Sequence, residues 1–301
     1  MNTESSSNRY PITMDPTEDE VEEFQKGLEA YNMEQTNGEF NSPQPWLSLV
    51  LKDHEGTIVG GILTSTLYWT QYLEVLWVDE KYRGLGYGRD LVWEAHRLGR
   101  NQGCVSSHTY TFSWQAPEFY QAVGYKLIAT YDGYAGGIIE HILMKKLDSL
   151  DNSTDQKIDS SRFIIVEDST TESQTIVRRG LGSNFDDNVS HVLSEYPHTC
   201  FNFILKNNDG KVIGGVNGYT TLGTMFMEGL WVAEPYRRQG YGKELLLHTE
   251  KLAKERRCVA NQSTCFTFQN LGFFKNQGYG FYGHTDAYPN EVKEYFLIKR
   301  F

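Results

Sequence analysis

One segment of this chain recurs 154 positions further along, and this repeat limits the folds that the chain can adopt. Residues 76–88 read as an apolar strand, a short loop and a Gly-rich turn into a helix, and residues 230–242 repeat that pattern. Without gaps, 28 of the 90 positions in 58–147 are identical in 212–301, against about one in sixteen expected by chance at ordinary composition. A period this long is typical of two whole domains rather than of a solenoid.

The boundary between the two repeats is visible in the composition. Residues 148–161 are polar and nearly free of apolar side chains, which is typical of a solvated linker. We therefore predict a first domain over 8–147, a linker over 148–161 and a second domain over 162–301. Each domain has about 140 residues, which is enough to bury a sizeable core.

Composition places the chain among ordinary globular proteins. It is 39% hydrophobic and 14% aromatic, and no apolar run approaches the ~20 residues of a membrane span. The first eleven residues are polar, without the apolar core of a signal peptide. The four cysteines show no CxxC spacing, which fits free thiols in a reducing compartment. We expect a cytoplasmic protein without a membrane partner.

The net charge of −11 is unevenly distributed. Residues 1–150 carry 11 Lys and Arg against 21 Asp and Glu, whereas residues 151–301 carry 17 against 18. Such an acidic chain argues against nucleic acid as a partner. The acidic first part fits either an ordinary soluble surface or the steering of a cationic substrate. We favour the first reading, because residues 15–23 alone hold six carboxylates on one expected helix.

Hydrophobic periodicity within one repeat predicts an alternation of helices and strands. Thr17 and Glu20 form a capping-box pattern at the start of a first helix. The later elements are expected as strands over 46–51, 57–63 and 72–78, a helix over 89–100, a strand from 103, a short helix over 116–123 and a strand over 138–145. This order predicts an α/β (α+β) unit in which helices flank a mixed sheet, and the second repeat predicts the same.

The Gly-rich turn at 83–88 has the chemistry of an anion-binding site. The N–H groups at a helix start lack intrahelical partners and carry the positive end of the helix dipole. No Ser, Thr, Asp or Asn stands at the start of this helix to cap it. Glycines also allow a ligand to approach the backbone closely. A phosphate loop would need Gly-Lys-Ser/Thr, and a dinucleotide fingerprint would need wider glycine spacing, so neither fits.

Two motifs together resemble a known family. Arg83, Gly86 and Gly88 match the [Gln/Arg]-x-x-Gly-x-[Gly/Ala] signature of the GNAT superfamily of N-acetyltransferases, as do Arg237, Gly240 and Gly242. Residues 116–125 also resemble the C-terminal helix of that family, A-x-x-F-Y-x-x-x-G-[Phe/Tyr]. The resemblance covers nearly the whole chain and implies two tandem GNAT-like domains, each with a mixed, splayed central sheet.

The resemblance implies acetyl-CoA as co-substrate. The eight histidines show no metal-ligand spacing, so we predict no metal. The resemblance also implies that the pyrophosphate rests on the amides of the Gly-rich turn and that the pantetheine arm bonds the backbone of the preceding strand. In the first repeat the implied contacts are Leu76, Trp77, Val78, Arg83, Gly84, Leu85, Gly86, Tyr87, Gly88 and Arg89. In the second they are Leu230, Trp231, Val232, Arg237, Arg238, Gln239, Gly240, Tyr241, Gly242 and Lys243.

Acetyl transfer to an amine needs a proton acceptor near the amine. An amine of pKa ~10.4 is mostly ammonium at pH 7, and its deprotonation costs about 4–5 kcal/mol. Glu74 is our candidate base, because an unpaired carboxylate within an apolar strand would be costly. Strand alternation would place it on the same face as Tyr72 and Leu76. The alternative is a structural carboxylate bonded to a backbone turn or an arginine.

The departing thiolate needs a proton donor. Tyr120 matches the Tyr of the family's helix, and the resemblance implies that its phenol protonates the sulfur. The alternative is a tyrosine that only packs over the sheet. The second repeat has Phe274 at this place, so Tyr279 or Tyr282 would have to substitute there. The second repeat is therefore expected to bind acetyl-CoA without efficient turnover, to complete the substrate site of the first or to serve structure, and an active second site stays open.

The predicted function is transfer of the acetyl group of acetyl-CoA to a primary amine by direct attack. The alternatives are a non-catalytic acetyl-CoA-binding or sensor module and a transferase that uses a longer acyl-CoA. The acceptor is expected to be a small-molecule or peptide amine. We expect a monomer, in which the two repeats form a pseudo-dimer, or a homodimer.

Overall fold

The computed structural model describes residues 10–40, 47–147 and 163–301, so the predicted linker at 148–161 lies outside the described residues. The first repeat contributes β1 (Ile12–Thr13), β2 (Leu47–Lys52), β3 (Ile58–Leu67), β4 (Thr70–Val78), β5 (Ser106–Phe112), β6 (Lys126–Tyr131), β7 (Glu140–Lys146), α1 (Glu18–Gln35), α2 (Tyr87–Asn101) and α3 (Pro117–Ala122). The second contributes β8 (Ile164–Glu167), β9 (Thr199–Lys206), β10 (Val212–Thr221), β11 (Thr224–Val232), β12 (Ala260–Phe266), β13 (Gly280–Thr285), β14 (Glu294–Arg300), α4 (Thr171–Glu195), α5 (Tyr241–Glu255) and α6 (Leu271–Asn276).

Most predicted elements are confirmed. Thr17 caps α1 in a capping box with Glu20, and the helices and strands expected between residues 46 and 145 lie within a few residues of their predicted bounds. The prediction missed β6 and its counterpart β13, as well as the short strands β1 and β8. The missed strands matter, because they join the two repeats to one another.

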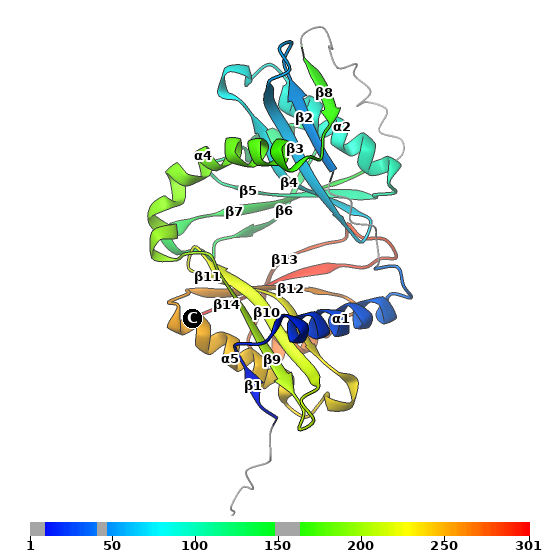
Figure 1. The fold of residues 1–301 in the computed structure, drawn as a ribbon, viewed down its shortest axis with the longest axis vertical. Helices are drawn as coiled ribbons and strands as arrows, with labels where there is room; N and C mark the ends of the chain where they lie inside the picture. Colours follow the sequence, from blue (N-terminus) through cyan, green and yellow to red (C-terminus); the bar gives the residue numbers. More distant parts are fainter. Residues whose placement is uncertain (1–9, 41–46, 148–162) are drawn as a thin grey trace, which may run out of the picture.

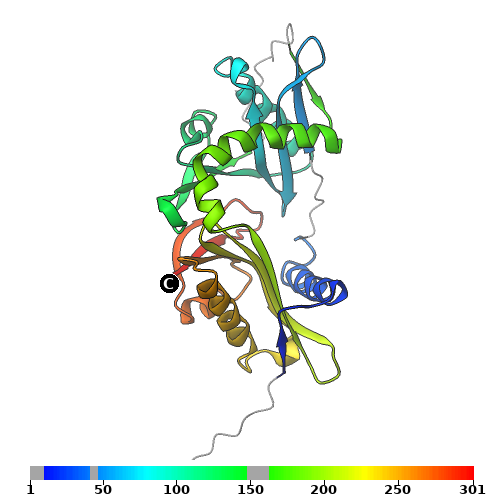
Figure 2. The same ribbon diagram turned by 60° about the vertical axis from the view of Figure 1, so that its left-hand side comes forward.

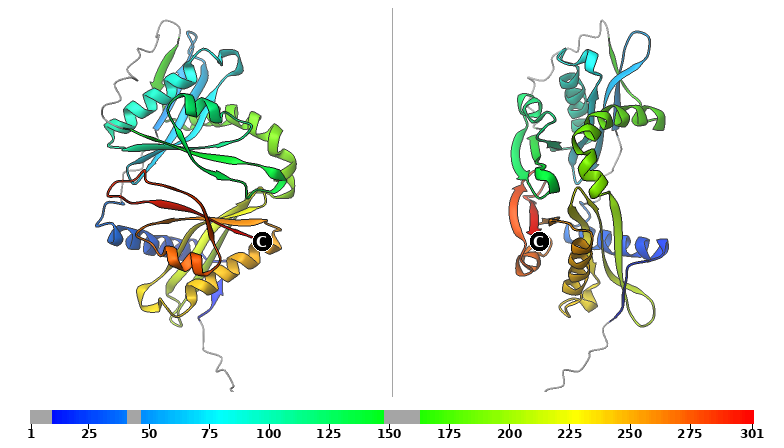
Figure 3. Two further views of the ribbon diagram at one scale, coloured as in Figure 1. Left: turned by 180° about the vertical axis from the view of Figure 1, so that it is seen from behind. Right: turned by 90° about the vertical axis from the view of Figure 1, so that its left-hand side faces the viewer.

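All fourteen strands of the described residues form one mixed sheet, in the order β1-β9-β10-β11-β12-β14-β13-β6-β7-β5-β4-β3-β2-β8. At its centre β6 meets β13 through the pair Ala129 and Gly283, which are counterparts 154 residues apart. The repeat is therefore related to itself by a pseudo-twofold axis at this point (Figure 3). A side chain at Gly283 would lie 2.4 Å from Cβ of Ala129, so the close approach of the two strands requires glycine.

The two repeats exchange their first strand and helix. Strand β1 pairs with β9, and α1 packs on β9, β10 and β11 of the second repeat. In return β8 pairs with β2, and α4 packs on β2, β3 and β4 of the first. Figures 1 and 2 show α1 beside the yellow strands of one half and α4 across the blue strands of the other. We call β2–β7 with β8 and α4 the first half, and β9–β14 with β1 and α1 the second half.

Two tryptophans hold the exchanged helices in place. The ring of Trp77 in β4 lies against Gly180 of α4, where an added Cβ would be 2.2 Å from the ring. The ring of Trp231 in β11 lies against Gly27 of α1, where an added Cβ would be 2.5 Å away. Trp77 and Trp231 were predicted to contact acetyl-CoA through their backbone atoms. Their side chains pack between the sheet and the exchanged helices.

The central strands of each half separate part of the way along. Strands β4 and β5 pair in parallel only from Thr70 with Ser106 to Leu73 with Thr109. Strands β11 and β12 likewise pair only from Thr224 to Met227. Beyond these points the edge of β4 that faces β5, and the edge of β11 that faces β12, have no strand partner in the part of the chain that the structure describes. The predicted α/β fold, with a splayed, mixed set of strands flanked by helices in each half, is thus confirmed, and the two sets join into one sheet.

Candidate functional site

The Gly-rich turns form uncapped helix starts in both halves. Gly86 is the N-cap of α2 with φ of 94°, and Gly240 is the N-cap of α5 with φ of 92°. Neither helix start has a side-chain cap. The first amides of each helix therefore have no intrahelical acceptors and receive no bond from the glycine N-cap, at the positive end of a 15-residue helix. Each turn can hold the phosphates of a ligand in this way.

Arginines tie each turn to the strand before it. Nε of Arg83 donates to the carbonyl oxygen of Val78 at 2.9 Å, and Nε of Arg237 donates to that of Val232 at 2.8 Å. The next position differs between the halves. Gly84 has φ of 75°, whereas its counterpart Arg238 adopts φ of 60°, a conformation that costs a non-glycine residue roughly 1–2 kcal/mol.

The exchanged segments also support these turns. Phe163, just before β8, contacts Tyr87 with a ring-centroid distance of 4.4 Å. Tyr10, just before β1, stacks on Tyr241 at 5.7 Å. Each Gly-rich turn is therefore supported by an aromatic ring from the other repeat, although the turn itself is local in sequence.

The remaining predicted acetyl-CoA residues lie on the expected strand and helix starts. Leu76 and Val78 pack into the cluster under α2. Leu85 is exposed in the turn, and the guanidinium of Arg89 lies 4.7 Å from the ring centroid of Trp93. In the second half, Leu230 and Val232 pack against the core under α5 in the same way, with Gln239, Gly242 and Lys243 around the helix start.

Glu74 lies on a β-bulge rather than in a regular strand. Leu63 pairs with Val75 and Thr64 pairs with Leu73, so Glu74 has no partner on β3. The Ser65 hydroxyl donates to Oε1 of Glu74 at 2.6 Å. The side chain is exposed, so the burial cost that we expected for this carboxylate does not arise. Glu228 is the corresponding bulge residue in β11.

The bulge also corrects the predicted face of the strand. Ser65 is the cross-strand partner of Tyr72, so the bond from Ser65 places Glu74 on the face of Tyr72. Leu76 packs on the opposite face, in the cluster under α2. The prediction that Glu74 shares a face with Leu76 is therefore wrong, because the extra residue of a bulge reverses the alternation that follows it.

Tyr120 lies on the α2 face of the sheet, at the level where β4 and β5 separate. Its side chain is buried in the cluster under α2. It is hydrogen-bonded with the side chain of Thr109, and burial raises the pKa of its phenol to about 12. Thr109 is the last residue of β5 that pairs with β4. The phenol therefore stays protonated at neutral pH and can donate a proton beside the point of separation.

The counterpart in the second half has no such hydroxyl. Phe274 is buried in the cluster under α5. The ring centroid of Tyr279, named above as a possible substitute, lies 5.5 Å from that of Phe274. Among the described residues, the buried hydroxyl of Tyr279 has no hydrogen-bond partner. The hydroxyl of Tyr282 instead accepts from Nε2 of Gln262 at 3.1 Å.

Sequence reasoning missed a polar cluster on the opposite face of β4 and β5. The rings of Tyr72 and His108 lie 5.5 Å apart. Residues from the second half reach this face: Nε2 of His108 contacts Oγ1 of Thr285 at 3.1 Å, and the hydroxyls of Tyr72 and Tyr288 are 2.5 Å apart. Burial lowers the pKa of His108 to about 4, so its imidazole is neutral. The repeat aligned Tyr288 with Tyr134, but only the fold brings it to Tyr72.

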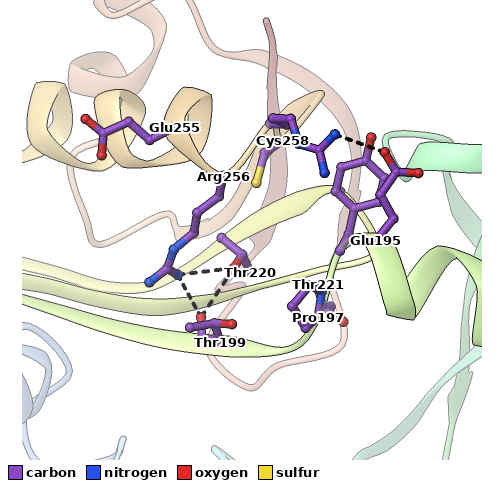
Figure 4. Close-up of a pocket in the computed structure, with 11 residues that line it drawn as sticks. Glu195, Pro197, Thr199, Thr220, Thr221, Glu255, Arg256 and Cys258 are labelled. Atoms are coloured by element: carbon purple, nitrogen blue, oxygen red, sulfur yellow. Dashed lines mark hydrogen bonds and ion pairs between the residues drawn. The ribbon is translucent and has the colours of Figure 1, made fainter.

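A pocket of about 220 Å³ lies elsewhere, at the C-terminal end of α5 (Figure 4). Arg256 donates to the carbonyl oxygen of Thr199 and to Thr220, and Arg257 pairs with Glu195. The Gly-rich turn is at the other end of this helix, about 22 Å away at 1.5 Å per residue. The pocket is therefore separate from the predicted site.

Two searches of the described residues bear on other kinds of site. No group of three His, Cys, Asp or Glu in the described part of the chain could hold a metal ion. Within the same residues, no helix is long and apolar enough to cross a membrane.

Comparison with known proteins identifies the family. The model of the acetyltransferase (GNAT) family matches residues 13–125 and again residues 167–279. Blasticidin-S acetyltransferase of Streptomyces morookaense is 39% identical over 93 residues, which is 31% of this chain and 68% of that protein. The chain therefore belongs to the GNAT family of acetyltransferases and contains two copies of the family's domain.

Solved structures were also found. An acetyltransferase from Bacillus cereus ATCC 14579 is 30% identical, with a TM-score of 0.41, and covers 45% of this chain and 96% of its own. A GNAT acetyltransferase from Elizabethkingia anophelis, solved with acetyl-CoA bound, is 18% identical, with a TM-score of 0.31, and covers 38% of this chain and 82% of its own.

Proposed function

We propose that the chain transfers the acetyl group of acetyl-CoA to a primary amine by direct attack, and that the first half is the catalyst. In this proposal residues 8–147 and 162–301 are two GNAT domains joined by a linker at 148–161. The observation that carries the proposal is the position of Tyr120. Its protonated phenol, which comes from α3, lies beside Thr109 in the last residue pair between β4 and β5. Strand β4 leads from there to the uncapped start of α2.

The proposed pose follows from this arrangement. The pyrophosphate of acetyl-CoA lies on the amides at the start of α2, and the pantetheine arm bonds the unpaired edge of β4 after Leu73. The thioester then lies where the strands separate. The amine attacks the carbonyl carbon, the carbon–sulfur bond breaks, and Tyr120 gives its proton to the departing sulfur.

Glu74 remains the candidate base beside the amine. It lies on the face of β4 opposite Tyr120, next to the same point of separation. A carboxylate on one face and a phenol on the other suit a reaction in which the amine and the leaving sulfur are on opposite sides of the thioester. The exposure of Glu74 also permits a water-mediated transfer.

For the second half we propose acetyl-CoA binding without efficient turnover. It keeps the uncapped helix start at Gly240 and the bulge residue Glu228, but it has Phe274 in place of the proton donor. This half would then resemble the binding or sensor module considered above. A longer acyl-CoA as donor is a variant of the same proposal.

For the acceptor we propose a small basic molecule. The curated relative is named as an acetyltransferase of blasticidin S, a small molecule. A peptide amine is the competing acceptor. We propose a cytoplasmic monomer in which the two repeats form the pseudo-dimer, with a homodimer as the alternative.

The test is release of the CoA thiol from acetyl-CoA with a panel of amines, including blasticidin S, other aminated antibiotics, polyamines and peptides. We expect turnover with at least one small amine and mass spectra that show one added acetyl group. Acetyl-CoA binding without turnover of any amine would reject the enzyme and favour the sensor module.

A further inference from the structure

A chain of three hydrogen-bonded side chains crosses from the second half to the first. The hydroxyl of Tyr72 in β4 lies 2.5 Å from that of Tyr288, in the loop after β13. The hydroxyl of Tyr288 donates to Oε2 of Glu294 in β14 at 2.5 Å. Tyr288 and Glu294 are 5% and 6% exposed, whereas Tyr72 is only partly buried. The chain therefore runs from a buried carboxylate to a partly buried tyrosine of β4, two residues before the exposed Glu74.

The direction of the hydrogen bonds in this chain is fixed. Tyr288 has a single hydroxyl proton, and it is donated to Glu294. The proton between the two tyrosines must therefore come from Tyr72. As a result, the Tyr72 oxygen keeps its lone pairs for a further donor, and the carboxylate at the far end makes that oxygen more electron-rich.

We infer that the second half supplies this chain as the ammonium-binding and proton-accepting arm of the first half's acetylation site. The inference rests on the proposed function and adds to it a binding site for the acceptor. The acceptor ammonium donates to the Tyr72 oxygen, while Tyr288 and Glu294 are positioning residues that act through Tyr72.

The proton balance of the proposed step is complete. The ammonium gives one proton to Tyr72, Tyr72 passes its own to Tyr288, and Tyr288 passes its own to the Glu294 carboxylate. The neutral amine then bonds to the thioester carbon, and the carbon–sulfur bond breaks. The nitrogen gives its second proton to Glu74 and Tyr120 gives its proton to the sulfur, after which the proton on Glu74 returns to Tyr120 through solvent. The products are the amide, CoA thiol and one proton, which Glu294 later returns to solvent.

The surroundings of Glu294 suit a proton acceptor. Burial raises the pKa of its carboxyl above the ordinary value, so accepting a proton from an amine costs less than it would for a free carboxylate. Within the described residues, the titratable groups that face this chain are Tyr72 and Glu74 from β4, His108 and Tyr110 from β5, Cys265 from β12, Tyr282 from β13 and Tyr288 from the following loop. None of these groups is a cation at neutral pH, so the ammonium of the acceptor would be the cation that meets this carboxylate.

The equivalent tyrosine–glutamate pair of the first repeat, which lies beside the second half, provides the contrast. Tyr134 donates to Oε2 of Glu140 at 3.0 Å, as Tyr288 does to Glu294. The counterpart of Tyr72, however, is Phe226, whose ring lies 5.8 Å from that of Tyr134. The second half thus lacks a hydroxyl at the end of the chain, and it also lacks the counterpart of Tyr120. Both hydroxyls are present only at the first site.

The experiment compares Tyr288→Phe and Glu294→Gln with the unchanged full-length chain. Thiol release is measured between about pH 6 and pH 9.5 with an amine that the unchanged chain acetylates. We expect kcat to fall at least about tenfold at pH 7 in both variants. The loss should shrink towards pH 9.5, because more of the amine is already neutral there. Affinity for acetyl-CoA should stay within about twofold.

The matched controls are Tyr134→Phe and Glu140→Gln, which change the equivalent pair of the first repeat. We expect these variants to keep activity within about twofold at every pH. A loss in Tyr288→Phe and Glu294→Gln that is equal at all pH values would indicate a structural role and overturn the inference. Unchanged activity would overturn it too, while leaving the proposed function intact. If the unchanged chain acetylates no amine, the proposed function fails and the inference falls with it.

Discussion

The two halves of this protein keep the same backbone features but differ in the side chains that handle protons. Gly86 and Gly240 form the same uncapped helix start with almost the same φ. In contrast, the first half has hydroxyls at Tyr72 and Tyr120, where the second has Phe226 and Phe274. The difference teaches that a duplicated domain can keep the backbone geometry of a site while its hydroxyl-bearing side chains change, and in the function that we propose those hydroxyls are the groups needed for turnover.

A second contrast concerns buried polar groups near the site. In the first half the hydroxyl of Tyr125 bonds with Ser107 at 2.6 Å and with Nε2 of His96 at 2.7 Å. The counterparts in the second half are Tyr279 and Asn261, whose buried polar side-chain atoms have no partners among the described residues. The tyrosine hydroxyl behind the proposed proton donor is therefore hydrogen-bonded in the half that we propose to be active, whereas its counterpart in the other half is not, among the described residues.

The largest effect is expected when the first half is given the residues of the second. The double variant Tyr72→Phe with Tyr120→Phe should lower turnover at least about a hundredfold, because it removes one hydroxyl on the amine side and one on the sulfur side. Thiol release measures the rate, and calorimetry should find acetyl-CoA binding retained. Turnover at the original rate would show that the second half is the catalyst.

Substitution of the glycines that contact Trp77 and Trp231 should weaken the packing of the exchanged helices. Gly180→Ala places a methyl group against Trp77 and should lower the free energy of unfolding by about 1–3 kcal/mol. Gly27→Ala should act in the same way through Trp231. The control is Gly182→Ala in the same helix, where an added Cβ meets nothing within 4 Å.

Urea unfolding followed by circular dichroism measures these three variants. Because each half contains a helix of the other repeat, we expect one transition that shifts as a whole in both destabilised variants. Two transitions, with only one shifted by each substitution, would contradict this coupling of the halves.

Tyr120→Phe alone should lower kcat at least about tenfold and leave acetyl-CoA affinity within a few-fold. The matched variant is Phe274→Tyr, for which we expect little change, since the second half still lacks a hydroxyl at Phe226. Stopped assays of thiol release compare the two. A similar rate in Tyr120→Phe and the unchanged chain would remove Tyr120 from the mechanism.

The smallest effect is expected from substitutions at the helix starts. Gly86→Val and Gly240→Val each force a side chain into positive φ and should weaken acetyl-CoA binding at their own site by about tenfold. Calorimetry of the unchanged chain should find two sites per chain, and each variant should keep one tight site. A single site in the unchanged chain would show that one matching motif does not bind.

The local features of the site could be predicted from the sequence. The capping box at Thr17, the strand before each Gly-rich turn and the uncapped starts at Gly86 and Gly240 depend on neighbouring residues, and all are observed. The bulge at Glu74 could not be predicted, because a bulge depends on the register with β3. The junction between β6 and β13 could not be predicted either, because it is a contact between the two repeats.

The sequence by itself determined the duplication, the family and the difference at Tyr120 and Phe274. Only the tertiary structure decided which helix covers which half and which second-half residues reach Tyr72. The physical reason is that the repeats offer near-equivalent surfaces. Each helix carries a glycine that could pack against either tryptophan. No local sequence pattern therefore decides whether a helix covers its own repeat or the other one. The selection comes from packing across the whole sheet, and it brings Tyr288 and Glu294 to the site of the first half.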